Sequence, residues 1–141
     1  MKKTIVSTVL LFFVAGITQL FAYVTPESGK VYRIHNVKSD KVISEDCIAR
    51  QLASVDAAGN DDFKQLWLLK ESNNGYTIQN AYSGQYLHHC AQQSTRIYHT
   101  GAEEAVMYLT QVNGTQYAIG QASGAYLHLD GSNNIVRWYD E

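Results

Sequence analysis

Hydrophobic and polar residues alternate over short stretches of the chain, and one such pattern occurs three times. In the clearest copy, Tyr76-Thr-Ile-Gln-Asn80 is followed by Ala-Tyr-Ser-Gly and then by Gln-Tyr-Leu-His88. Residues 117–128 repeat this pattern with one residue fewer, and residues 32–43 form a weaker copy. Tyr-x-Ile alternates as a half-buried strand does, and Ser-Gly or Ser-Asp favours a turn before a return strand. The pattern therefore predicts three strand–turn–strand units at a spacing typical of repeated structures.

Further short strands are predicted between the copies. A polar stretch at residues 53–62 precedes the apolar segment 65–69, and another apolar segment covers residues 106–109. Asn-Gly at positions 74–75 and 113–114 is typical of hairpin turns and joins one unit to the next. No stretch has the period of a long amphipathic helix. We therefore predict an all-β fold, a closed barrel with pseudo-threefold symmetry, in which closure removes exposed sheet edges. The units are expected at about residues 31–72, 73–113 and 114–141.

The third unit is shorter than the other two. Trp67 closes the first unit, and the equivalent position in the third unit would fall beyond Glu141. Two explanations fit this pattern. The sequence is the front part of a longer protein, which we favour, or a lead-in strand around Tyr23 fills the gap.

The first 22 residues have the pattern of a secretory signal peptide. Lys2 and Lys3 form a charged start, an apolar core covers residues 5–17, and Ala22 ends an acceptable cleavage site before Tyr23. A membrane anchor is the alternative, but the apolar run is short and interrupted by polar residues. No cysteine follows the cleavage site, so lipid attachment is not indicated. We therefore expect an exported protein with a domain at residues 23–141 and no membrane association after cleavage.

Composition agrees with one globular domain and narrows the choice of partners. The 141 residues are 45% hydrophobic and 17% charged, and the formal net charge is −2. A mildly acidic chain without a run of basic residues lacks the electrostatic surface that nucleic acids or anionic lipids require. We expect no nucleic-acid partner.

These features together resemble the ricin-type β-trefoil lectin domain family. That family has three repeats, each with a Tyr-x-Ile/Leu-x-Asn opening, a Ser-Gly-x-Tyr/Cys-Leu turn and a closing Gln-x-Trp. Gln65-Leu-Trp67 matches the closing segment, and Val106-Met-Tyr108 takes its place in the second unit. The resemblance implies a β-trefoil fold and a carbohydrate-binding role. The residues that carry the signature are Tyr32, Gln65, Trp67, Tyr76, Tyr86, Tyr108, Tyr117 and Tyr126.

The resemblance also points to sugar-binding positions. In galactose-binding members, an Asp follows the Leu of the second strand, and an aromatic residue on the third strand stacks on the sugar. The Asp position reads Ser44, His88 and His128 here, so the resemblance does not imply galactose specificity. The aromatic position reads Tyr98 and Trp138, each ten residues after its histidine, and the first unit has none.

The predicted sites therefore lie in units two and three. Alternation along the strand places His88 and His128 outside if the preceding leucines face the core. Packing in the barrel or its cap is the alternative for Tyr98 and Trp138. Near Trp138, Asp130 and Arg137 would contact sugar hydroxyls or simply be solvated surface charges.

Other chemistry is less well supported by the sequence. His88-His89-Cys90 with His99 contains good zinc ligands, but neighbouring residues of a strand face opposite ways and the paired spacings of zinc sites are absent. We predict no metal and no cofactor. A Cys90–histidine catalytic pair lacks a third orienting group, so no enzymatic activity is predicted.

Two further sequence features have structural explanations. Cys47 and Cys90 lie almost one repeat apart, and equivalent places of two units are too distant for a disulfide, so we expect two free, buried thiols. Asn113-Gly-Thr115 fits a glycosylation sequon and is better explained as the turn between units two and three.

Taken together, the sequence predicts an exported, non-catalytic module that binds a glycan or polysaccharide through shallow sites. If the chain continues beyond Glu141, the module would hold a downstream catalytic domain near its glycan. The alternative is a protein-binding module, such as a protease inhibitor or adhesion domain, because a fold does not fix a function. An enzyme would instead need a deep pocket with converging titratable groups.

Overall fold

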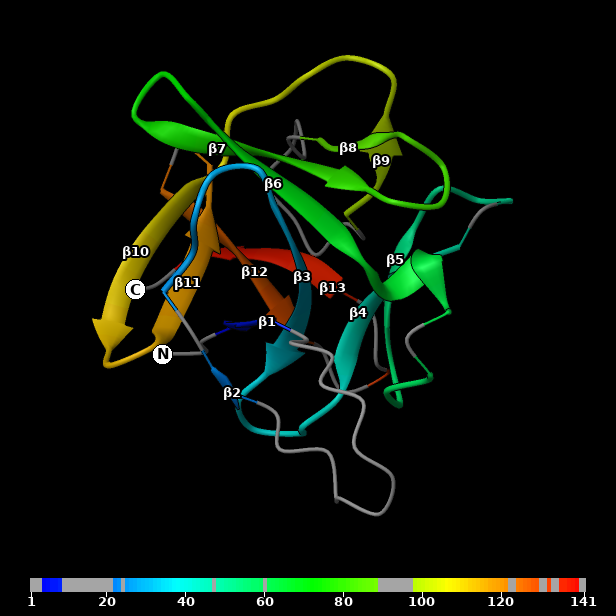
Figure 1. Cartoon of the computed structure of the whole chain (residues 1–141), viewed down its shortest axis with the longest axis horizontal. Coiled ribbons are helices and arrows are strands. Elements are labelled where there is room, and N and C mark those ends of the chain that lie inside the picture. Colours follow the sequence, from blue (N-terminus) through cyan, green and yellow to red (C-terminus); the bar gives the residue numbers. More distant parts are fainter. Residues whose placement is uncertain are drawn as a thin grey trace.

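A computed structural model describes residues 4–8, 22–23, 25–46, 48–59, 61–88, 98–121, 124–129, 132 and 135–139, with the backbone alone described at 4–8, 22–23 and 137–139. This part of the chain forms thirteen strands, one short 3-10 helix and no α-helix (Figure 1). Within it, no helix is long and apolar enough to cross a lipid bilayer. The elements are β1 (Thr4–Thr8), β2 (Ala22–Tyr23), β3 (Lys30–Asn36), β4 (Val42–Glu45), β5 (Leu52–Val55), η1 (Phe63–Gln65), β6 (Trp67–Ser72), β7 (Gly75–Asn80), β8 (Tyr86–Leu87), β9 (Thr100–Gly101), β10 (Tyr108–Asn113), β11 (Gln116–Gly120), β12 (Ala125–Leu129) and β13 (Ile135–Tyr139).

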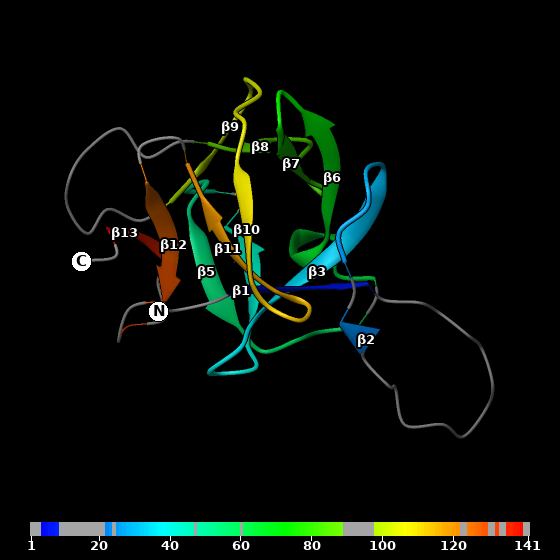
Figure 2. The same ribbon diagram turned by 90° about the vertical axis from the view of Figure 1, so that its left-hand side faces the viewer.

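Six of the strands pair in a ring. The antiparallel pairs run from β1 to β3, then to β6 and β7, and from β10 to β11 and back to β1 (Figure 2). The remaining link joins β7 to the residue before β10, where Tyr76 and Met107 exchange two backbone hydrogen bonds of 2.8 Å. A ring leaves no long open sheet edge, as the repeated pattern predicts.

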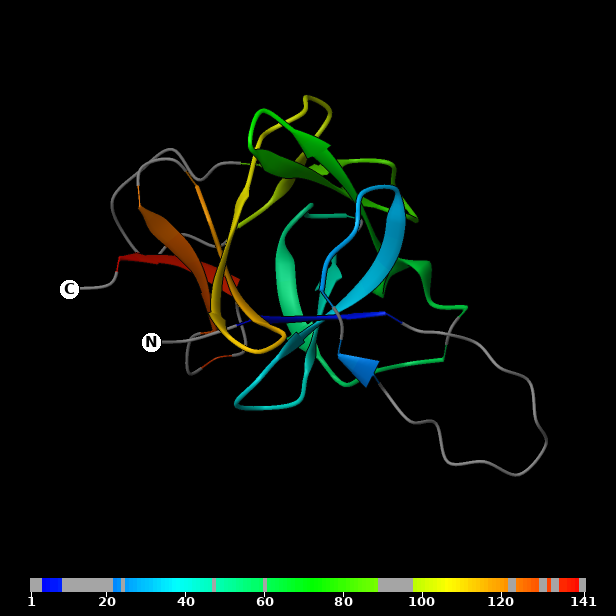
Figure 3. The ribbon, with the colours of Figure 1, turned by 60° about the vertical axis from the view of Figure 1, so that its left-hand side comes forward.

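Three hairpins lie beside this ring, one from each unit. They are formed by β4 with β5, β8 with β9, and β12 with β13 (Figure 3). Backbone hydrogen bonds join them at one place: the amide of Leu52 donates to the carbonyl of Tyr98 at 2.8 Å, and the amide of Tyr98 donates to Ile135 at 2.7 Å. Leu52, Tyr98 and Ile135 therefore occupy corresponding positions in the three units.

The turns that open the three hairpin units share one hydrogen-bond pattern. In each unit, the last residue of the first barrel strand, or the residue just after it, accepts a hydrogen bond at its backbone carbonyl. The donor is the amide of a residue with positive φ. The positive φ explains why Gly stands there twice and Asp once, since most side chains are strained in that conformation. The third turn is one residue shorter, as its sequence predicts. The accepting and donating residues are Asn36 and Asp40, Asn80 and Gly84, and Gln121 and Gly124.

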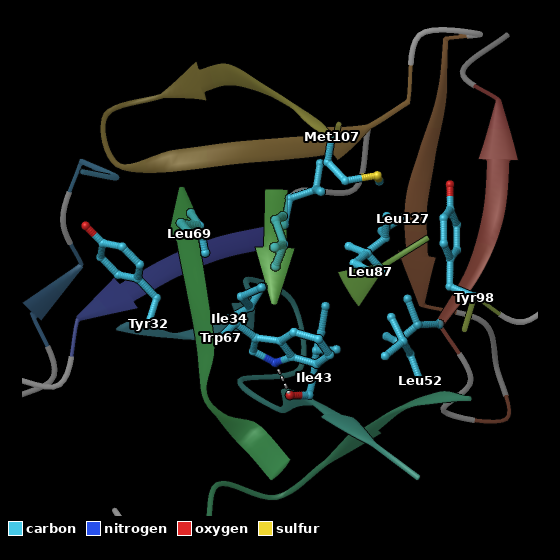
Figure 4. Close-up of a cluster of buried hydrophobic side chains, with 13 residues drawn as sticks. Tyr32, Ile34, Ile43, Leu52, Trp67, Leu69, Leu87, Tyr98, Met107 and Leu127 are labelled. Atoms are coloured by element: carbon cyan, nitrogen blue, oxygen red, sulfur yellow. Dashed lines mark hydrogen bonds between the residues drawn. The ribbon is translucent and has the colours of Figure 1, made fainter. Parts of the chain in front are cut away.

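The core fills the space between the ring and the hairpins (Figure 4). Barrel strands contribute Ile34, Leu69 and Ile78, and the hairpins contribute Leu87 and Leu127. Core residues of one strand, such as Trp67 and Leu69 on β6, stand two positions apart because alternate side chains of a strand point to one face. The same alternation leaves the residues next to them on the opposite face, where a binding site is possible.

The Gln-x-Trp segment has a structural role. The Gln65 side chain donates from Nε2 to the carbonyl of Asp56 at 3.0 Å and accepts from the amide of Ala58 at 2.9 Å. It thereby fixes the polar stretch before η1. Trp67 is buried, and its indole Nε1 donates a hydrogen bond to the backbone carbonyl of Ile43 on β4.

The second unit fills the Trp67 position with Met107, not with Tyr108 as predicted. Trp67 lies opposite Tyr32, and Met107 lies opposite Tyr76, the corresponding residue of the second unit. Met107 is fully buried, whereas Tyr108 is half-buried. The prediction was wrong by one residue, and a shift of one residue moves a side chain to the other face of the strand.

The gap in the third unit is filled by a segment that neither explanation considered. β1 lies between β3 and β11, which is the place of the strand that the third unit lacks. The strand at Tyr23, β2, pairs with β1 and lies outside the ring. The predicted signal peptide and domain boundaries remain predictions, but five residues of that segment form a barrel strand in this structure.

Candidate functional site

The candidate site is built on the outer side of the β8–β9 hairpin. Leu87 is buried and His88 is half-exposed, so the predicted alternation is confirmed in the second unit. His88 donates its amide to the carbonyl of His99 at 3.1 Å. The two imidazole rings stack, with centroids 5.8 Å apart and an angle of 23° between the ring planes.

Tyr86 extends this surface along the same strand. It lies opposite Gly101, and strand alternation puts Tyr86 and His88 on the same side. Gly101 has no side chain, and a Cβ placed there would lie 3.2 Å from Cδ2 of His88. The glycine therefore lets the His88 ring lie close to the backbone. We call the surface of Tyr86, His88, His99 and Gly101 the β8–β9 face.

Glu104 sets the charge at one side of this face. Its carboxylate forms a hydrogen bond with the Tyr86 side chain. The pKa of Tyr86 lies above its ordinary value because desolvation disfavours the phenolate and the carboxylate repels it. Tyr86 therefore stays a neutral phenol, while the two imidazoles can donate and accept hydrogen bonds. A neutral polar ligand with several hydroxyl groups suits such a surface.

The third unit has a corresponding surface on the β12–β13 hairpin. Leu127 is buried, and Tyr126 and His128 are half-buried, as Tyr86 and His88 are. His128 lies opposite Val136, and Tyr126 lies opposite Trp138. We call Tyr126, His128 and the backbone of 136–138 the β12–β13 face. Asp130 and the side chains of Arg137 and Trp138 lie outside the described residues.

Tyr98 does not belong to either face, so this part of the site prediction was wrong. Its side chain is 0% exposed, and its hydroxyl donates to Oε1 of Gln121 at 3.3 Å. Figure 4 shows it at the edge of the core, near Leu52. The ten-residue spacing misled the prediction because His88 lies opposite His99, whereas His128 lies opposite Val136 only eight residues on. Gly101, not Tyr98, corresponds to Trp138.

The residues that the prediction missed are His99, Glu104 and the surface role of Tyr86. The family resemblance assigns Tyr86 to the repeat signature alone. The alternation of Tyr86, Leu87 and His88 was a sufficient signal for Tyr86. His99 required knowledge of the register between β8 and β9, which the sequence does not give.

A buried carboxylate holds strand β9, and with it His99 and Gly101. Glu45 on β4 accepts a hydrogen bond from the Thr100 hydroxyl, and its Oε1 lies 3.4 Å from Nη1 of Arg50. The backbone carbonyl of Arg50 also accepts a hydrogen bond of 2.8 Å from the amide of Thr100. The first unit thus fixes the edge of the β8–β9 face. In the described part of the first unit, Val42 is buried where Tyr86 stands in the second unit, so these residues form no comparable face.

The described residues bear on the metal prediction but do not include either cysteine. Among these residues, no three His, Cys, Asp or Glu side chains are close enough together to hold a metal ion. His89, Cys90 and Cys47 lie outside the described residues, so the free state of the thiols stays a prediction.

Comparisons with known proteins agree with this architecture. The sequence model "Ricin-type beta-trefoil lectin domain-like" matches residues 17–97, more than half of the chain. Among solved structures, a Macrolepiota procera ricin B-like lectin in complex with lactose is similar, with a TM-score of 0.73 and 18% identity over 84% of this chain and 91% of that one. No curated protein sequence matches the chain. The structural similarity establishes the shared fold, which confirms the predicted β-trefoil.

Proposed function

Because the chain belongs to the ricin-type beta-trefoil lectin domain-like family, we propose that it is an exported, non-catalytic module that binds a glycan through its second and third units. The observation that supports this proposal is the equivalence of Tyr86 and His88 with Tyr126 and His128. Each pair stands at the same place of its hairpin, next to a buried leucine, and is partly exposed.

The chemistry of these side chains suits a sugar. An aromatic ring offers an apolar face to the C–H groups of a pyranose, and a hydroxyl and an imidazole donate and accept hydrogen bonds to its hydroxyl groups. On the β8–β9 face, Tyr86 and His99 border His88 in this way. On the β12–β13 face, we propose that Trp138 supplies the ring, with Asp130 and Arg137 contacting hydroxyl groups.

Two shallow sites on one domain would act together on a polymer. Each site alone is expected to bind weakly, and simultaneous contact with one polysaccharide raises the apparent affinity without new contacts. Export would bring the module to glycans outside the cytoplasm. If a catalytic domain follows downstream, the module would keep it near that glycan.

A second candidate, a protein-binding module, has one observation in its favour. Ile48 is 97% exposed, and Phe63 and Tyr82 are more than half exposed. Asn80 ties the turn that carries Tyr82 to η1, which carries Phe63, because its Nδ2 donates to the carbonyl of Lys64 at 2.9 Å. A contiguous exposed apolar patch is typical of protein contacts, so this candidate requires one partner to contact Phe63 and Tyr82 together.

A glycan array distinguishes the two candidates. We expect the full chain to bind at least one glycan class, and His88→Ala, His128→Ala and Trp138→Ala each to weaken binding. Tyr82→Ala is the matched control, because it removes an exposed aromatic ring that belongs to neither face. If no glycan of the array binds, and a protein ligand binds the wild type but not Tyr82→Ala, the protein-binding module is supported instead.

A further inference from the structure

The N-terminal strand β1 lies inside the barrel wall, between two strands from opposite ends of the domain. Thr4, Ile5, Val6 and Ser7 pair with β3, in register with residues 36 to 33. On its other side, Thr4 and Ile5 pair with Tyr117 and Gln116 of β11. In Figure 3, β1 is the dark blue strand that crosses the barrel beside β3. The ring of strands is closed only when β1 is in place.

Among the described residues, no strand other than β1 pairs with the edges of β3 and β11 that face it. β3 pairs with β6 through its first half, residues 30–32, and β11 pairs with β10 on its far side. The half of β3 that pairs with β1 carries buried side chains, at Arg33, Ile34, His35 and Asn36. A buried backbone group that loses its hydrogen-bond partner costs about 1–3 kcal/mol. An empty gap here would therefore be strongly unfavourable.

We infer that the gap between β3 and β11 is a strand-acceptor site, and that its occupant is the chain's own N-terminal segment, Thr4–Thr8. The sequence of that segment, Thr-Ile-Val-Ser-Thr, has four β-branched residues and no Gly or Pro, which favours a central strand. Its backbone supplies hydrogen bonds to both neighbours, as in recognition by β-strand addition.

The N-terminal segment then has two roles that exclude each other: it is removed as a signal peptide, or it stays in the barrel as β1. If residues 1–22 leave as a signal peptide, as the proposed export requires, the acceptor site is opened, so the uncleaved chain and the exported module differ at this part of the barrel. The same segment, added as a separate peptide, then has a site to which it can bind. The inference does not depend on glycan binding, since neither the β8–β9 face nor the β12–β13 face contains a residue of β1 or β3.

The test uses the uncleaved chain with Val6→Pro, because proline is excluded from central strands. Hydrogen exchange is measured at the amides of Arg33, His35 and Tyr117, which face β1, because the amide of Asn36 donates to Lys41 on the other side of β3 and alternate amides of a strand point to opposite edges. We expect their protection to fall about tenfold or more in Val6→Pro, and to return when a synthetic peptide of residues 2–8 is added. Thr25→Pro, at an exposed position outside the strands, should match the wild type.

Several outcomes would overturn the inference. Unchanged protection in Val6→Pro would mean that β1 does not close the barrel, and failure of the peptide to restore protection would mean that the site does not accept a strand. Restoration by a peptide that itself carries Val6→Pro would show nonspecific binding. A dimer with restored protection would assign the site to another segment of a second copy. If Val6→Pro does not fold, exchange in the wild type decides, since the amides of Ile5 and Ser7, which face β3, must themselves be protected.

Discussion

The indole Nε1 of Trp67 donates a hydrogen bond of 3.0 Å to the backbone carbonyl of Ile43, which joins barrel strand β6 to hairpin strand β4 (Figure 4). The indole is buried in the core, so no water can replace this bond. Trp67 also lies opposite Tyr32 in the barrel. One side chain thus fixes the first hairpin onto the barrel, and the Gln-x-Trp segment serves the fold, not a ligand.

Replacing Trp67 with Phe should therefore destabilise the domain. The change leaves the Ile43 carbonyl without its donor, at about 1–3 kcal/mol, and the smaller ring leaves a cavity that adds to the loss. We expect a total of at least about 2 kcal/mol in the free energy of unfolding, measured by urea denaturation with far-UV circular dichroism. Phe63→Leu, at a half-exposed aromatic position, should cost less than about 0.5 kcal/mol. Equal effects of the two changes would contradict the assigned role.

Tyr98→Phe tests whether the buried tyrosine contributes to the stability of the fold or to sugar binding. The change removes the hydroxyl that donates to Gln121 across two units, and leaves the ring in place. We expect the free energy of unfolding to fall by about 1 kcal/mol, with glycan affinity unchanged within a factor of about two. Thermal denaturation and a binding titration on the same sample provide the two values. A loss of affinity at unchanged stability would restore Tyr98 to the binding site.

Gly84 tests the shared turn geometry. Its φ is +69°, and a Cβ at this position would meet only Nε2 of Gln79, at 3.9 Å. Backbone strain, not a clash, therefore sets the cost of a side chain here. We expect Gly84→Ala to lower the free energy of unfolding by about 1–2 kcal/mol, and Gly84→Asn to lower it less, because Asn adopts this conformation more readily. Alanine and asparagine variants of equal stability would show that the strain argument is wrong.

The stability of the domain should fall as the pH falls from about 7 to 5. The pKa of the buried His35 lies below its ordinary value, chiefly because burial disfavours the imidazolium, and Arg33 also repels it. Asp40, 3.5 Å away, opposes this shift without reversing it. The unfolded chain thus binds a proton near pH 6.5 that the folded chain does not, so stability is lost below that pH, by at most about 1.4 kcal/mol per pH unit.

His35→Gln is expected to remove this slope, whereas His99→Gln, at an exposed position, should keep it. Denaturant titrations at several pH values between 5 and 7 provide the measurement. Asp46 does not interfere, because its pKa is held below the ordinary 3.8 by hydrogen bonds from the amides of Ile48 and Ala49, and it titrates below this range. An unchanged slope in His35→Gln would exclude His35 as the group responsible.

Much of the fold follows from local patterns in the sequence. The turns at Asp40, Gly84 and Gly124 were readable because each needs a residue type that tolerates positive φ. The inward leucines and outward histidines were readable because the period of a strand is two. These signals involve only residues close together in the chain, and the structure confirms them.

The errors occurred where no local pattern sets the register. Val106-Met-Tyr-Leu is apolar throughout, so alternation does not show which residue corresponds to Trp67, and Tyr108 was chosen in place of Met107. Tyr98 was misplaced because spacing along the chain ignores the different lengths of two hairpins. The strand at Thr4–Thr8 was missed because a short apolar segment has the same appearance in a signal peptide and in a buried strand.

The most direct test of the central claim is a glycan titration of the isotope-labelled full chain, with imidazole resonances followed by NMR. The glycan is the best ligand from the array. The account predicts that the signals of His88, His99 and His128 shift with saturation, while that of the buried His35 stays fixed. Saturable binding that leaves all three surface histidines unchanged would place the sugar elsewhere and contradict the account.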